Sequence, residues 1–141
     1  METLGIRNNN PLNIRKVSGQ RWQGEVLPLG GDRRGSGSPF VRFESIEWGI
    51  RAAFVLLRTY SAKYHANCIR DIISRWAPPS ENDTEKYIKN VCLWTGLGGL
   101  QRLTEEDWPK LVRAMGRQEI GVLLDQETIN RGYKLFKNEQ P

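Results

Sequence analysis

Hydrophobic residues recur at helical spacing over the last two-thirds of the chain. In residues 45–64, Ile50, Phe54 and Leu57 follow one another at intervals of four and three, which predicts a helix with one buried face. Ser45 is a suitable residue to cap its first turn. We expect this helix to lie at the centre of the fold.

Four further segments show the same periodicity and have capping or helix-breaking residues at their ends. Proline cannot continue a helix and glycine commonly ends one, so Pro78 and the glycines within residues 96–99 mark two stops. Asp83 or Thr84, and later Thr104, are suited to cap helix starts. These helices are predicted over residues 67–77, 83–95, 104–119 and 126–137.

The first 44 residues have a different pattern. Residues 5–16 are rich in asparagine and contain Pro11, which is typical of a turn-rich loop. Residues 21–27 and 39–44 alternate like strands around a Gly/Ser/Arg stretch, so we expect a hairpin with a long flexible tip. The predicted fold is mainly α with a small β-hairpin, about five helices, in a single domain covering residues 1–141.

The charge is positive, with 21 Lys and Arg against 16 Asp and Glu among 141 residues. A net charge of +5 favours polyanions, which include nucleic acid and the bacterial envelope. The basic residues are scattered and form no dense run, so most are expected on the solvated surface and no nucleic-acid partner is predicted.

Cysteine and histidine are too few for most metal or nucleophile chemistry. Cys68 and Cys92 lie on separate predicted helices; two thiols are favoured over a disulfide, which stays an alternative. His65 is the single histidine and has no nucleophile motif beside it. We therefore expect no metal and no cofactor. The start of the chain has no apolar signal-peptide core and no segment reaches membrane-spanning length, so synthesis in the cytoplasm without membrane insertion is expected.

One carboxylate continues a hydrophobic stripe. Residues 108–115 place apolar side chains at i, i+3, i+4 and i+7, and the next position on that stripe is Glu119. Burial and the negative end of a helix dipole both raise the pKa of a carboxyl group, which suits a general acid. The alternative is that the helix frays at Gly116 and Glu119 simply reaches solvent.

Five motifs, in order, resemble a group of phage-derived proteins often described as virion structural proteins. The resemblance covers nearly the whole chain. The motifs are GIRNNNPLNIR (5–15), RWQGE (21–25), FVRFESIEWGIRA (40–52), IISRWAPPSENDTEKYIKNV (72–91) and RQEIG (117–121).

The same segments are similar, more distantly, to flagellar-type N-acetylglucosaminidases and lytic transglycosylases. In those enzymes an asparagine-rich segment and a W-x-G hairpin follow the catalytic glutamate, whereas here residues 8–14 and 22–24 precede Glu119. This order is typical of a circular permutation, which predicts that residues 8–14 pack beside Gly121 in space. Ile120 stands where Ser or Asn is usual, and Gln118 stands where the phage group tends to have His.

The resemblance implies a lysozyme-like α+β fold and a peptidoglycan-degrading activity of the muramidase, endolysin or lytic transglycosylase kind, with Glu119 as the acid. A second catalytic carboxylate would be Glu25 or, failing that, Asp32. Transglycosylases need no second carboxylate. Each of these two acids is otherwise an ordinary surface residue.

A glycan groove should contain aromatic rings, which stack on sugars, and side-chain amides, which bind hydroxyl and N-acetyl groups. Asn10 and Asn13 are the amide candidates, and turn formation explains them equally well. Any one tryptophan could belong to the core instead. The aromatic candidates are Trp22, Trp76, Tyr87 and Trp94.

Three classes of function remain. The leading hypothesis is a monomeric glycosidase that cleaves the bond between N-acetylmuramic acid and N-acetylglucosamine and whose partner is the glycan strand, acting at the cell wall or in a phage particle. The second is a non-catalytic virion or wall-binding protein with a degenerate groove. The third, a basic nucleic-acid-binding module, lacks any recognition motif.

Overall fold

The computed structural model describes residues 3–26 and 39–138. Over these ranges the chain is mainly helical, as the hydrophobic pattern predicts, but it has six α-helices rather than five. The additional helix is a single turn near the start of the chain, too short to show a periodicity. The helices are α1 (Leu4–Arg7), α2 (Ile46–Tyr64), α3 (Ile69–Trp76), α4 (Thr84–Thr95), the 3-10 helix η1 (Glu105–Asp107), α5 (Trp108–Ile120) and α6 (Gln126–Asn138).

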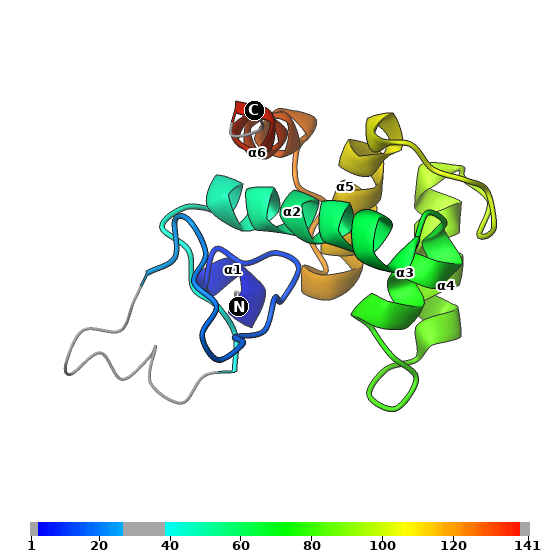
Figure 1. Ribbon diagram of the computed structural model, residues 1–141, viewed down its shortest axis with the longest axis horizontal. Helices are drawn as coiled ribbons and strands as arrows, with labels where there is room; N and C mark the ends of the chain where they lie inside the picture. Colours follow the sequence, from blue (N-terminus) through cyan, green and yellow to red (C-terminus); the bar gives the residue numbers. More distant parts are fainter. Residues whose placement is uncertain (1–2, 27–38, 139–141) are drawn as a thin grey trace.

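Helix α2 crosses the middle of the molecule, with α6 on one side, the N-terminal segment on the other, and α3 and α4 beyond its C-terminal end (Figure 1). Ile50, Phe54 and Leu57 are buried, and α2 contacts both α5 and α6. The predicted central helix is therefore confirmed. Ser45 has extended backbone geometry before the first turn, but its side chain makes no capping hydrogen bond.

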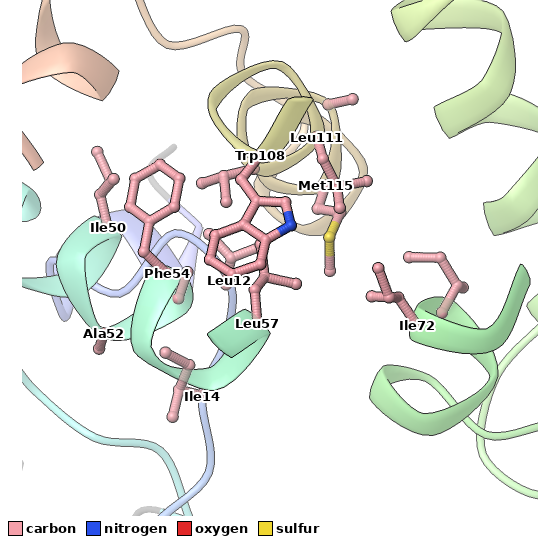
Figure 2. Packing of buried hydrophobic residues seen from close by; sticks show 14 of the residues in the cluster. Leu12, Ile14, Ile50, Ala52, Phe54, Leu57, Ile72, Trp108, Leu111 and Met115 are labelled. Carbon is pink, nitrogen blue, oxygen red and sulfur yellow. The ribbon is translucent and has the colours of Figure 1, made fainter. Parts of the chain in front are cut away.

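The N-terminal segment and the helices share a hydrophobic cluster (Figure 2). Leu12 lies where Phe54 and Leu57 of α2 meet Trp108 of α5, and Ile14 belongs to the same cluster on the other side of α2. Burying one such side chain stabilises the fold by about 1.5–3 kcal/mol. The segment before α2 is thus held in place by the core that the helices make.

The predicted hairpin is not present as paired strands in the described part of the chain. Two isolated antiparallel bridges occur there instead, Arg15 with Phe40 and Glu25 with Phe43. Residues 39–44 therefore pair with two segments. Residues 14–16 lie on one side, and the segment around Glu25 lies on the other. The hydrophobic pattern could not predict the pairing of residues 14–16 with residues 39–44, because a polar side chain links them. The Asn10 amide donates to the carbonyl oxygens of Ile14 and Val41. The expected flexible tip lies outside the described residues.

The asparagine-rich loop lies directly against α2. The carbonyl oxygen of Asn9 occupies the place where a side chain at Gly49 would project, so a larger residue at Gly49 would push the loop away. Asn9 and Asn13 both have left-handed backbone geometry, with φ of 53° and 52°. Asparagine tolerates this conformation better than most residues.

Across residues 3–26 and 39–138, no helix is both long and apolar enough to cross a membrane. Cys68 is buried and Cys92 is half-buried, and the two thiols are not bonded to each other, as favoured by the sequence. Burial raises the pKa of both thiols, which makes them poor nucleophiles.

Candidate functional site

Glu119 lies in the last turn of α5, just before Gly121 ends the helix in a left-handed conformation. Its side chain is half-buried and both of its oxygens accept hydrogen bonds. Asn13 Nδ2 donates to Oε1 at 3.0 Å, and the Tyr87 hydroxyl donates to Oε2 at 3.0 Å. Asn13 is 106 positions away in the chain, so the predicted meeting of residues 8–14 with the end of α5 is confirmed.

Burial raises the pKa of the Glu119 carboxyl group above its ordinary value. The hydrogen bonds from Asn13 and Tyr87 favour the carboxylate and lower the pKa, but by less than burial raises it. The direction agrees with the expectation from the hydrophobic stripe. Such a carboxyl group holds its proton closer to neutral pH than an exposed glutamate does.

Glu119 lines a cleft of about 400 Å³. One wall comes from residues 12–22 together with Phe40, and the opposite wall comes from residues 76–82 after α3. Leu56 and Tyr60 of α2 lie between the two walls. The cleft thus separates the N-terminal segment from the α3–α4 region.

Three of the predicted substrate-binding residues line this cleft. Asn13 lies beside Glu119, Trp22 belongs to the N-terminal wall, and Trp76 belongs to the opposite wall. Trp22 is only 7% exposed, so little of its ring surface is open to the cleft. Trp76 is half-buried, and its ring packs edge-on against Tyr60 with 5.8 Å between centroids.

The other two predicted substrate-binding residues are buried outside the cleft lining. Asn10 is 0% exposed and holds the N-terminal loop, because its Oδ1 accepts from the Ile14 N–H and its Nδ2 donates to two carbonyl oxygens. Tyr87 is 4% exposed and does not line the cleft, and its hydroxyl donates to the Glu119 carboxylate. Both residues therefore support the site without facing a ligand.

Of the two candidates for a second carboxylate, the structure describes only Glu25. Glu25 does not line the cleft, and its Oε1 accepts a hydrogen bond from the backbone N–H of Trp22 at 2.9 Å. Asp32 lies outside the described residues. Glu81, which the sequence did not single out, lines the cleft on the wall opposite the N-terminal segment. The turn that presents it is fixed by hydrogen bonds from the Glu81 and Asn82 N–H groups to the Pro78 carbonyl oxygen.

Ile120, which departs from the enzyme motif, and Gln118, which departs from the phage-group motif, both have structural contacts. Ile120 is 2% exposed and packs against Gly5 of α1. A side chain at position 5 would collide with Ile120. Gln118 accepts a hydrogen bond from Asn90 Nδ2 at 2.9 Å, which joins α5 to α4. Ile120 therefore anchors the end of α5 in the core where a small polar residue is expected.

Comparison with known proteins gives one clear relationship. The chain is 44% identical to Protein P5 of Pseudoalteromonas phage PM2 over 120 residues, which cover 83% of this chain and 71% of that protein. The chain belongs to the P5 family. Membership in the P5 family agrees with the phage origin expected from the motifs. No family model matches the chain.

Proposed function

We propose that this P5-family protein cleaves the β-1,4 bond between N-acetylmuramic acid and N-acetylglucosamine in peptidoglycan, with Glu119 as general acid. One observation carries the proposal: a half-buried carboxyl group with a raised pKa opens into a cleft and is held by two donors from distant segments. Structural ion pairs also shift pKa values, but neither partner of Glu119 is charged.

The first step is protonation of the leaving group. Protonated Glu119 donates its proton to the glycosidic oxygen while the bond from that oxygen to the anomeric carbon breaks, and positive charge develops on the sugar ring. The carboxylate that remains accepts from Asn13 and Tyr87. Because these donors stabilise the ionised form, they favour the proton transfer as it proceeds.

In the second step one of two nucleophiles forms a bond to the anomeric carbon. In transglycosylation the 6-hydroxyl of the muramic acid attacks, and the Glu119 carboxylate takes the hydroxyl proton, which regenerates the acid and leaves an anhydro ring. In hydrolysis a water molecule attacks and a second carboxylate accepts its proton. Glu81 is the other carboxylate among the described residues that line the cleft, so it is our candidate for that role.

The cleft walls suit a glycan strand. Trp76 and Tyr60 offer apolar ring surface for sugar rings, and Asn82 offers an amide for hydroxyl or N-acetyl groups. The arrangement supports a permuted lysozyme-like fold, in which the asparagine loop returns to the catalytic glutamate from the opposite end of the chain. Action at the cell wall or in a phage particle is consistent with the phage relative.

Digestion of purified peptidoglycan tests the proposal. The protein and its Glu119→Gln variant are incubated with the same sacculi over a range of pH values, and released muropeptides are identified by mass spectrometry. We expect soluble products from the wild type only. Anhydromuramic ends would assign transglycosylation, and reducing ends would assign hydrolysis. Absence of soluble products at every pH would reject the enzymatic function.

A non-catalytic wall-binding or virion protein is the second candidate, and Ile120 favours it. A hydrophobic residue buried against α1 replaces the small polar neighbour that orients the acid in related enzymes. Binding to sacculi without any release of sugar would support this candidate.

A further inference from the structure

A second groove, of about 490 Å³, lies on another face of α5. Lys110, Arg113 and Arg117 line it, and their spacing of three and four residues places them on one face of the helix. Arg117 and Glu119 are two residues apart, which turns their side chains by about 200° around the helix axis. The basic groove and the acidic cleft are therefore on different sides of α5.

Among the described residues the three cations of this groove form no ion pair, although Glu106 lines the groove and Arg113 is close enough to Asp125 to contribute to lowering its pKa. Glu106 is the acidic residue among those lining the groove. Like charges on one helix face repel each other, so their arrangement is favourable when an anionic ligand is bound.

Two of the cations are held in position. Arg113 Nε donates to the carbonyl oxygen of Leu124 at 2.7 Å, which leaves its terminal nitrogens for a ligand. The guanidinium of Arg117 lies over the ring of Trp94 at 4.2 Å. A planar guanidinium that is already oriented binds a carboxylate with little loss of side-chain entropy.

The rim of the groove is partly apolar. Leu123 lines it and is 52% exposed, and the neighbouring Val122 is 41% exposed. Trp94 adds an aromatic surface to the lining. A ligand that carries both carboxylates and short apolar side chains matches this surface better than a bare polyphosphate or a nucleic-acid backbone does.

We propose that the groove on this face of α5 binds the acidic peptide stems of peptidoglycan, a role that rests on the proposed function. An α-helix with its side chains is about 10–12 Å across. An extended peptide of five residues spans up to about 17 Å. A stem on a neighbouring glycan strand can therefore enter the groove, whereas a stem on the glycan in the cleft would have to run fully extended around α5 and the helices packed on it. A second attachment point of this kind raises the effective concentration of the glycan at the cleft.

Co-sedimentation with sacculi tests this site. Glu119→Gln protein, which leaves the glycan uncut, is compared on intact sacculi and on sacculi stripped of peptide stems by an amidase. The groove variant adds Lys110→Gln and Arg117→Gln, and retains Arg113 because it anchors Leu124. The control adds Lys63→Gln and Lys134→Gln, which remove the same charge from α2 and α6, outside both the cleft and the groove.

We expect the groove variant to bind intact sacculi about 2- to 30-fold more weakly than the control, from two partly exposed charge pairs. The difference should disappear on stripped sacculi and shrink at high salt. Equal binding by the two variants, or binding that does not depend on stems, would overturn the proposal. The proposal would also be overturned if the protein bound duplex DNA or anionic lipid vesicles more tightly than sacculi and the groove substitutions abolished that binding. The groove would then bind another polyanion.

The two proposals fail separately. The groove substitutions, introduced with Glu119 intact, should leave the cleavage rate on stem-free glycan unchanged. If the protein releases no sugar yet shows stem-dependent binding, the glycosidase function is rejected and the groove remains. If it cleaves glycan but binds stripped and intact sacculi equally, the groove is rejected and the glycosidase function remains.

Discussion

Replacing Glu119 with glutamine removes the transferable proton and changes little else in shape. The side chain is nearly isosteric, so the cleft should keep its geometry. General acid catalysis typically contributes a factor of about 10² to 10⁴. We expect the rate of muropeptide release to fall by at least that lower factor, with little loss of affinity for the glycan.

The effect of Glu119→Gln on stability has two opposing parts. The amide oxygen can accept from Asn13 while the amide NH₂ donates to the Tyr87 hydroxyl oxygen, so both contacts can persist but neither is any longer assisted by a carboxylate charge. That weakening costs about 0.5–1.5 kcal/mol. Against it, the variant no longer places a carboxylate in a half-buried site. We expect the melting temperature to change by less than about 5 °C.

The pH dependence separates these two parts. Folding raises the pKa of Glu119, so its contribution to stability is fully present below the pKa of an unfolded-chain glutamate, about 4.3, and is lost as pH rises through the folded pKa. The variant has no such titration. The free energy of unfolding of the variant relative to the wild type should therefore increase between those two pKa values and then level off.

Thermal unfolding across pH, combined with product analysis, checks both consequences. Circular dichroism gives the melting temperatures of the two proteins in matched buffers, and mass spectrometry gives the released sugars. Undiminished muropeptide release by the variant would remove Glu119 from the mechanism. A stability difference that stays constant with pH would show that Glu119 titrates alike in the folded and unfolded chain.

Three other substitutions probe the residues around the acid. Tyr87→Phe removes a donor that lowers the pKa of Glu119, so the alkaline limb of the pH–activity profile should move to higher pH and the rate should fall about 10-fold; an unmoved limb would contradict this. Asn10→Ala leaves buried backbone groups without partners and should lower the free energy of unfolding by about 3 kcal/mol, measured by urea denaturation; a loss below 1 kcal/mol would argue against its structural role. Trp76→Ala should raise KM about 3- to 10-fold and alter kcat less, and an unchanged KM would place the glycan elsewhere.

The helices were predictable because each follows from neighbours in sequence. The stripe over residues 108–115 gave the buried face of α5, and its continuation correctly placed Glu119 toward the interior. Thr104, which the sequence suggested as a cap, forms a capping box with Asp107 at the start of η1. Periodicity and capping act over three to seven residues, which is the range that a sequence pattern reports directly.

The roles of Asn10, Tyr87 and Glu25 were not predictable in this way. An asparagine or tyrosine has the same local signature whether it faces a ligand or a buried partner, and the partners here are up to 32 positions away. The Glu25 carboxylate accepts a hydrogen bond from the backbone N–H of Trp22, a contact that the W-x-G motif did not predict. No sequence pattern identified Glu81, because its place in the cleft depends on the N-terminal segment that forms the opposite wall.

By itself the sequence determined the helical class, the approximate extent of the long helices and the carboxylate on the buried face of α5, because local periodicity and capping act on all three. The start predicted at residue 104 is a separate 3-10 helix, and α5 itself begins at Trp108. Its motifs also predicted that the asparagine loop returns to Glu119. Tertiary structure decided which residues surround that carboxylate, because the packing of α2 against the N-terminal loop and of α4 against α5 brings Asn13 and Tyr87 to it. The same packing separates the cleft from the basic face of α5, since one helix carries both on different sides.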